Sequence, residues 1–414
     1  MDKEHIVLLS LIRNALHEEK KVEILSSDVE WEKVFRLAAG QNLLPIIVNE
    51  AGKLPNVKED RSFKRYHALS LGMIIEQAKY TQNFLQIYRQ FAAHGIYPIV
   101  MKGLICRKLY RKYANHRMSS DEDILIEKEN FDTVKSILEK NGFVCENQDV
   151  TWKQLERVQE ITFKKPMSNL SIEVHVNPIG HENSIRDTMN DFFTDVFKES
   201  IFEEFVDSRK EVISVRTMNQ TEHFLFLILH AFKHFTGSGF GLRQCIDILI
   251  FQERYAEIIN WEIILPRLKQ VGVLQFFSDI QWIGNSYMGF AHDLVSSPNC
   301  PDELLEDLLL NGAFGNETQA QRTAISLTSA AVSVESEETH FIKKWIYTIF
   351  PQRKRMISFH PELADKPWLL PLFWLKRIRR LLIHRNEADG DLLAESIKIS
   401  NRRVALLRKY QVVS

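Results

Sequence analysis

The chain has 414 residues, of which 45% are hydrophobic and 26% are charged, and its formal net charge at pH 7 is -1. This composition is typical of a folded globular protein, excludes a disordered chain, and gives no overall attraction to nucleic acid. Its four cysteines lack the spacing of a disulfide framework or a structural zinc site, and no apolar run reaches the about 18 residues of a membrane span, so we expect a cytoplasmic protein.

Helices are predicted in the first part of the chain. Apolar residues recur at helical spacing within residues 6–16 and 31–37, and a longer amphipathic helix is predicted over 66–93. Pro55 and the charged stretch behind it indicate a boundary. The first predicted unit is therefore a helical N-terminal region, residues 1–63.

The hydrophobic period then changes to that of strands. Strands are predicted over 96–101, 121–126, 161–164 and 170–176, helices over 104–113 and 129–140, and a hairpin turn over 166–169. Strands and helices within so short a span indicate a small mixed sheet with helices packed on it. We therefore expect an α+β fold, with this core over residues 64–215 between helical N- and C-terminal regions.

Helices are predicted again in the second half. Asn219, followed three residues later by Glu222, forms a start that resembles a capping box, and the apolar sequence behind it is typical of a buried helix. We expect a helical domain over residues 216–340 and a separate basic, aromatic tail over residues 341–414.

The tail has an unusual composition. Residues 341–385 contain eleven Lys and Arg against two acids, interleaved with Trp, Tyr and Phe. Such a segment is able to bind nucleic acid or to make peripheral contact with an anionic membrane surface. The favoured interpretation is that four apolar residues pack on the body while the arginines remain solvated: Leu372, Leu375, Ile378 and Leu382.

Two aspartates open the second predicted strand. Asp121 and Asp123 stand at i and i+2, so they share one face with their backbones about 6.6 Å apart. Two carboxylates at about 4 Å repel each other by roughly 4 kcal/mol at an effective dielectric near 20. A divalent metal ion is the expected compensation. Glu122, between them, is expected to point to the opposite face, toward solvent.

A third acid lies in the last predicted strand of the core. Glu173 is flanked by apolar residues, where an unpaired charge would be costly, and His175 shares its face. If this strand lies beside the Asp121–Asp123 strand, three carboxylates converge. Such a set, with two divalent ions about 3.5–4 Å apart, suits phosphoryl or nucleotidyl transfer. For His175 a hydrogen-bonded structural role is the favoured alternative.

The Lys102–Gly103 turn precedes the first short helix of the core. Glycine lets backbone amides approach a phosphate, and Lys102 supplies a positive charge, unless it is merely a solvated surface residue. Arg117 is expected either to contact phosphate or to form a salt bridge that orients Asp121 or Asp123.

Three further polar residues lie in apolar helices. His230 and His234 have the i, i+4 spacing of metal ligands, but the glutamate of a metalloprotease motif is missing, so a core or supporting role is favoured. Asp247 is expected to be paired, with His230 or Arg243 as its partner.

This succession of motifs resembles the DNA polymerase β-like nucleotidyltransferase superfamily: strand, glycine-containing turn, helix, Asp121-x-Asp123, and a strand in which apolar residues flank Glu173. More narrowly, the chain resembles the bacterial uncharacterised nucleotidyltransferase family. That resemblance rests on the Lys-Gly turn, the arginine before Asp-x-Asp, the Glu-x-His strand and the buried helix with a following aspartate. Phe350–Pro351 and the segment 368–371 are similar to that family's tail.

The resemblance implies catalytic metal ligands and a nucleotide site. Asp121, Asp123 and Glu173 would bind two Mg²⁺ ions, and Lys102 and Gly103 would bind the triphosphate, with Arg117 and His175 counted with the nucleotide-binding residues. The implied reaction moves a nucleoside monophosphate from an NTP, expected to be ATP, to an unknown hydroxyl or phosphate acceptor and releases pyrophosphate. A small molecule, peptide or protein acceptor is favoured over nucleic acid.

Two other functions remain open from the sequence. A Lys-Gly turn stands where the superfamily has Gly-Ser, and Glu122 stands where it has an apolar residue; both would suit a catalytically degenerate nucleotide-binding or scaffold protein. A metal-dependent nuclease using Asp123, Glu173 and His175 is the less favoured alternative, because it leaves the Lys102–Gly103 turn unexplained.

Overall fold

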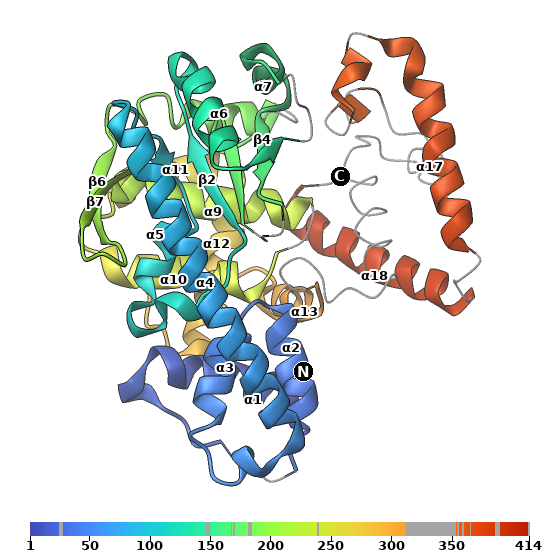
Figure 1. Ribbon diagram of the computed structural model, residues 1–414. Coiled ribbons are helices and arrows are strands. Elements are labelled where there is room, and N and C mark those ends of the chain that lie inside the picture. Colours follow the sequence, from blue (N-terminus) through green and yellow to red (C-terminus); the bar gives the residue numbers. More distant parts are fainter. Residues whose placement is uncertain are drawn as a thin grey trace.

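The computed structural model describes residues 1–24, 28–145, 150–166, 168, 170–180, 184–237, 240–311, 353, 356–357, 360–364, 366–385 and 390–412. Most of these residues are helical, and the strands form a five-stranded mixed sheet and a separate two-stranded hairpin (Figure 1). The chain is therefore α+β, as the sequence predicts.

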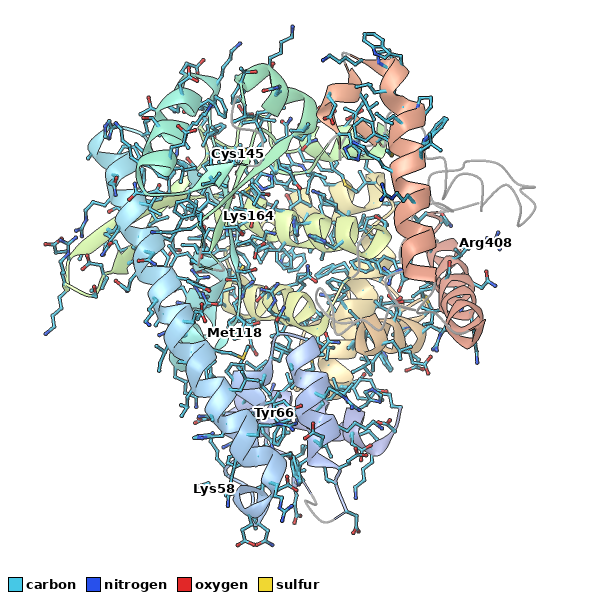
Figure 2. All side chains as sticks on the ribbon, turned by 45° about the vertical axis from the view of Figure 1, so that its right-hand side comes forward. Lys58, Tyr66, Met118, Cys145, Lys164 and Arg408 are labelled. Atoms are coloured by element: carbon cyan, nitrogen blue, oxygen red, sulfur yellow. The ribbon has the colours of Figure 1, made fainter. Side chains whose placement is uncertain are left out.

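The N-terminal region consists of three short helices and the first part of a long one. These are α1 (Lys3–Leu16), α2 (Trp31–Gly40), α3 (Leu44–Ala51) and α4 (Arg61–Ala93). Helix α4 begins five residues before the predicted start, because the Asp60 side chain accepts a hydrogen bond from the Ser62 amide and caps it. Tyr66 of α4 packs on Phe35 of α2 with ring centroids 5.4 Å apart, and Figure 2 shows it among the N-terminal helices. Helix α4 continues from there to the sheet (Figure 1).

The sheet has the order β1-β2-β5-β4-β3. Its strands are β1 (Ile99–Val100), β2 (Asp121–Leu125), β3 (Val144–Cys145), β4 (Glu160–Lys164) and β5 (Ser171–His175). Strands β2 and β5 are parallel, and the other three pairs are antiparallel. Figure 2 shows Cys145 and Lys164 on the neighbouring strands β3 and β4 at the sheet edge. In the sequence prediction β3 is missing.

Helices α5 (Leu104–Leu109), α6 (Phe131–Lys140), α7 (Trp152–Val158) and α8 (Ser184–Asp191) accompany the strands. The helix predicted over 104–113 changes at Tyr110 into a 3-10 helix over Arg111–His116. Strands β6 (Ile201–Val206) and β7 (Val212–Thr217) form a hairpin that the sequence analysis did not predict. Of the predicted turn at 166–169, Met167 and Asn169 lie outside the described residues.

The two faces of the sheet belong to two different hydrophobic clusters. Ile124 of β2 and Val174 of β5 are buried with residues of α4 and α6. The next residue, Leu125, and its partner Ile99 are buried instead with residues of the N-terminal and C-terminal helices. Because side chains alternate along a strand, adjacent side chains of β2 are buried in the two different hydrophobic clusters. Asp123 therefore lies on the same side as Leu125, away from α4 and α6.

The second half of the chain is helical. Its helices are α9 (Gln220–Thr236), α10 (Leu242–Tyr255), α11 (Trp261–Gln270), α12 (Leu274–Ile283) and α13 (Pro301–Asn311). Asn219 caps α9 by accepting a hydrogen bond from the Glu222 amide, as the sequence predicts. These helices share one hydrophobic cluster with α1, α2 and α3. The domain boundaries stay a prediction.

The described part of the tail contains α17 (Leu370–Arg385) and α18 (Gly390–Lys409). The predicted packing of Leu372 and Leu375 on the body is wrong, since these side chains are 47% and 63% exposed. The reason is local: Phe373 is the residue that turns inward, where it is buried with Met356 and Leu363. The side chains of Ile378 and Leu382, and the Phe350–Pro351 pair, lie outside the described residues. Within those residues no helix is long and apolar enough to cross a bilayer.

Candidate active site

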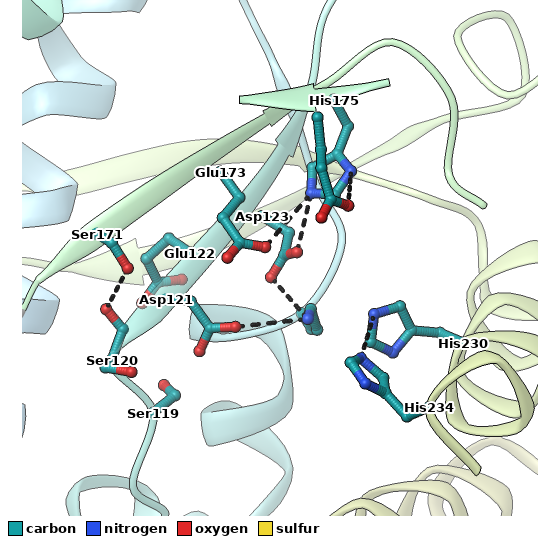
Figure 3. Close-up of polar contacts among 12 residues, drawn as sticks. Ser119, Ser120, Asp121, Glu122, Asp123, Ser171, Glu173, His175, His230 and His234 are labelled. Atoms are coloured by element: carbon teal, nitrogen blue, oxygen red, sulfur yellow. Dashed lines mark hydrogen bonds and ion pairs between the residues drawn. The ribbon is translucent and has the colours of Figure 1, made fainter. Parts of the chain in front are cut away.

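The parallel pairing of β2 with β5 brings the predicted acidic residues together. Asp123 and Glu173 are register partners, and Asp121 pairs with Ser171 two residues earlier. All three acids project from the sheet face opposite α4 and α6, as alternation along the strands requires. Figure 3 shows their carboxylates beside His175 and facing His230 and His234. The predicted convergence of three carboxylates is thus present in the structure.

The tightest group within this cluster consists of Asp123, Glu173 and His175. One potential ligand atom from each residue lies within 4.8 Å of the others. Nε2 of His175 donates a hydrogen bond to Asp123 Oδ1 at 3.0 Å and lies 3.8 Å from Glu173 Oε2. The buried Asp123 Oδ2 makes no hydrogen bond of good geometry within the described residues, and the ammonium group of Lys102 lies 3.1 Å from it. Two carboxylates gathered this closely fit a divalent cation, which would compete with Lys102 for that oxygen.

Lys102 supplies a positive charge between the two aspartates. Its Nζ lies 3.1 Å from Asp123 Oδ2 and 3.5 Å from Asp121 Oδ2. In this structure the ammonium group therefore compensates the repulsion that the sequence analysis assigned to a metal ion. Asp121 is not part of the tight group, and its side chain, like that of Glu173, is 26% exposed, whereas that of Asp123 is 1% exposed.

Burial and these close contacts determine the protonation states. Burial alone would raise the pKa of Asp123, but Lys102 and His175 outweigh it and hold that pKa below its usual range. Burial alone would lower the pKa of His175, yet its hydrogen bond to Asp123 and the nearby Glu173 carboxylate raise the pKa to about 9. Burial, followed by the Asp123 charge, raises the pKa of Glu173. At neutral pH His175 is therefore a cation that holds Asp123 in place.

Gly103 lies directly above the carboxylate of Glu122. Its φ is +56°, and a Cβ there would lie 2.7 Å from Glu122 Cδ. Glu122 accepts a hydrogen bond from the Leu104 amide at 2.8 Å and forms an ion pair with Arg107. The glycine is thus required by close approach of the turn to a side chain.

The predicted solvent exposure of Glu122 is wrong. The residue does point to the face opposite Asp121 and Asp123, but it is 1% exposed. Helix α5 begins beside the Glu122 carboxylate and brings the Arg107 guanidinium to it. Burial raises the pKa of Glu122, and the neighbouring Arg107 charge opposes this shift.

Arg117 reaches away from the two aspartates. Its Nε and Nη2 donate hydrogen bonds of 3.0 and 2.6 Å to Asp247, and Tyr110 donates another of 2.8 Å to the same carboxylate. The predicted salt bridge to Asp121 or Asp123 is therefore not the one formed. The sequence analysis predicted His230 or Arg243 as the partner of Asp247, which is also wrong. In the folded chain Arg117 binds both oxygens of the Asp247 carboxylate.

His230 and His234 lie side by side on α9, on the side that faces the acidic cluster (Figure 3). Their Nε2 atoms are 3.2 Å apart. Burial, together with the charge of Lys102, lowers the pKa of both rings well below the usual value. The two imidazoles are therefore neutral at pH 7, and they face the carboxylates from the opposite side of the site.

A small pocket adjoins the acidic cluster. It lies between the Lys102–Gly103 turn, Asp121, and helices α9 and α10, and His230 and Arg243 form part of its lining. The sequence analysis did not propose Arg243, Arg107 or Tyr110 as site residues. The sequence did contain a signal for Arg243, because it is a charged residue four positions before Asp247 and therefore lies on the same face of their helix.

Comparison with known proteins extends the sequence resemblance. No curated protein and no solved structure matches the chain. A family model described as uncharacterised nucleotidyltransferase matches residues 27–289, which is more than half of the chain and contains the whole acidic cluster. The protein belongs to the uncharacterised nucleotidyltransferase family.

Proposed function

We propose that the protein is an Mg²⁺-dependent nucleotidyltransferase that moves a nucleoside monophosphate from an NTP, with ATP as the expected donor, to a hydroxyl or phosphate acceptor. The single observation that supports this most is the meeting of Asp123, Glu173 and His175 from two strands that are far apart in sequence. Within a family of nucleotidyltransferases, such a cluster suits a metal-assisted in-line displacement. The arrangement is consistent with a polymerase β-like core.

The metal would be held by carboxylate oxygens. Asp123 and Glu173 supply the closest pair, and Asp121 adds a third carboxylate at the exposed edge. His175 binds Asp123 and keeps its second oxygen directed toward the cluster. A divalent ion bound there would lower the pKa of the attacking hydroxyl and neutralise charge that develops on the phosphates.

The chemical step forms one bond and breaks another. The acceptor oxygen attacks the α-phosphorus, the bond from that phosphorus to the oxygen bridging to the β-phosphate breaks, and pyrophosphate leaves with the electron pair. Glu173 is the carboxylate that we assign to receive the acceptor proton, because its side chain is 26% exposed and reaches solvent, whereas that of Asp123 is 1% exposed. Lys102 lies beside Asp121, where its positive charge would stabilise the negative charge that develops on the phosphates.

The test uses the full chain, Mg²⁺ and each of the four NTPs labelled at the α-phosphate, with release of pyrophosphate and transfer of label as readouts. We expect activity with at least one NTP and a loss of about 100-fold or more in Glu173→Gln. Glu127→Gln, an exposed acid just beyond β2, is the matched control. Equal activity in Glu173→Gln and the control would overturn the assignment.

One observation favours a second candidate function. Lys102 already neutralises Asp121 and Asp123, so it competes with a cation for the same oxygens. A catalytically degenerate protein of the same fold would bind an NTP through this lysine without transferring its nucleotide. Saturable NTP binding in a preparation that releases no pyrophosphate with any acceptor would favour this candidate over the enzyme.

We also propose that α17 makes peripheral contact with an anionic membrane surface. Leu372 and Leu375 of this helix, and Trp368 of the 3-10 turn just before it, are 47%, 63% and 70% exposed. The exposed Lys376 and Arg379 lie on the same helix. An exposed apolar stripe with neighbouring cations is typical of helices that bind a lipid interface.

A further inference from the structure

The pocket beside the acidic cluster is lined by three cations, and one of them, Arg243, has no acid partner within the described residues. Arg117 and Arg243 both line it and are only 2% and 6% exposed, and Lys102 lines it at the border with the cluster. Asp247 is the acid next to the two guanidinium groups, and it is already bound by Arg117 and Tyr110. Arg243 forms no ion pair with any described residue.

Each of the two arginines retains an unused donor. Arg117 binds Asp247 through Nε and Nη2, and its buried Nη1 has no acceptor among the described residues. Arg243 donates from Nη1 to the Met118 carbonyl at 2.8 Å, and its buried Nε likewise has no acceptor there. Burial, with the nearby Arg117 charge, lowers the pKa of Arg243. A buried donor without a partner is costly, and a buried cation more so.

The arrangement indicates which ligand would satisfy these donors. Two guanidinium groups from different segments of the chain, with an ammonium group at one side, match an anion that has several oxygens on neighbouring centres. A polyphosphate has this chemistry. The pocket shares Lys102 and Asp121 with the acidic cluster, so a chain of phosphates is able to extend from one to the other.

We propose that Arg117 and Arg243 bind the terminal phosphates of the nucleotide, and the pyrophosphate that it releases, in this pocket. The identity of the ligand rests on the proposed function, while the presence of an anion site rests on the two unused donors. Lys102 would then connect the two parts, with the α-phosphate at Asp123 and Glu173 and the β- and γ-phosphates at the arginines. Arg243 is the decisive residue, because Arg117 also has a structural role through Asp247.

The experiment measures binding of inorganic tripolyphosphate by isothermal titration in EDTA, so that neither a metal ion nor catalysis is needed. We expect the wild-type chain to bind it and Arg243→Gln to bind it at least tenfold more weakly, as loss of one charge-assisted hydrogen bond implies. Arg254→Gln removes the same charge from an exposed position of the same helix and should bind like the wild type. If Arg243→Gln does not fold, Arg243→Lys, which keeps the charge but loses the Nε donor, takes its place.

The outcomes separate this inference from the proposed function. The proposed anion site is overturned if the wild type does not bind tripolyphosphate, or if the wild type and the Arg243 variant bind it equally. This holds whether or not nucleotide transfer is observed. Arg243-dependent binding without any pyrophosphate release supports the pocket and counts against the enzyme. As an internal check, ATP should compete with tripolyphosphate more strongly than AMP does, and equal competition would overturn the placement of the terminal phosphates.

Discussion

Asp123 and Glu173 lie directly opposite each other on the parallel strands β2 and β5, and His175 donates a hydrogen bond to the first of them. The two acids are far apart in the sequence, so the site forms only when β2 and β5 pair. The acidic cluster therefore depends on one parallel pair within an otherwise antiparallel sheet.

Loss of Glu173 should weaken metal binding more than it weakens the fold. Its side chain is 26% exposed, whereas that of Asp123 is 1% exposed and is the nearest acid to both Lys102 and His175, so its removal would disturb the interior more. We expect Glu173→Gln to reduce the affinity for Mn²⁺ at least tenfold, measured by electron paramagnetic resonance without nucleotide. Glu127→Gln should bind Mn²⁺ like the wild type. Unchanged affinity in Glu173→Gln would show that this carboxylate is not a ligand.

Replacement of Gly103 by alanine should destabilise the protein for two reasons. A residue other than glycine is strained at its positive φ, and the new methyl group would collide with the Glu122 carboxylate. We expect a loss of about 3 kcal/mol in the free energy of unfolding, measured with urea. Gly95→Ala is the control, since its φ is also positive but nothing lies within 4 Å of its Cβ position; it should lose about 1 kcal/mol. Equal losses would show that Glu122 moves away freely.

Stability should fall as the pH is lowered from 6.5 toward 4, in part because of His223. Burial lowers the pKa of this histidine from 6.5 to about 4 in the folded chain. Protons then bind the unfolded state preferentially, so its contribution is complete above pH 6.5 and is lost as the pH falls toward 4. For this residue we expect a loss of roughly 2–3 kcal/mol near pH 4.5.

Urea unfolding of His223→Gln at pH 7 and pH 4.5 isolates that contribution. The difference in stability between the two pH values should be smaller in this variant than in the wild type. His94→Gln, at an exposed position at the end of α4, should keep the wild-type difference. An equal difference in the free energy of unfolding between pH 7 and pH 4.5 in all three proteins would contradict the role assigned to His223.

The exposed face of α17 should bind anionic vesicles. We expect the full chain to sediment with vesicles that contain phosphatidylserine and not with phosphatidylcholine alone, because both the apolar stripe and the neighbouring cations contribute. Leu375→Glu should abolish this binding. Leu294→Glu, an exposed leucine on the body, should not. Binding that survives Leu375→Glu, or that is equal for both lipids, would rule out this surface.

The acidic cluster was predictable because its members obey local rules. Asp121 and Asp123 share a face by strand alternation, and a charged residue among apolar neighbours, as at Glu173, requires a partner wherever it lies. The helices and central strands likewise follow from hydrophobic spacing and capping residues, such as Asn219. These signals lie within a few residues of each other in the sequence.

The partners of the buried charges were not predictable in the same way. Glu122 was expected to be solvated, yet α5 brings Arg107 to it, and Arg117 was expected near the aspartates, yet it binds Asp247 across the core. Such pairings depend on how helices dock, which alternation and spacing do not specify. The β6–β7 hairpin was missed although its strands alternate in exposure, because Lys210 rather than glycine takes the positive φ of its turn.

The register of β2 also determines what each of its charged residues can do. A slip by one residue against β5 would carry Glu122 to the side of His175 and turn Asp123 toward Arg107, leaving a differently shaped site and two mismatched charges in the interior. Substitutions that loosen this single strand pairing are therefore able to inactivate the protein without touching any reactive group.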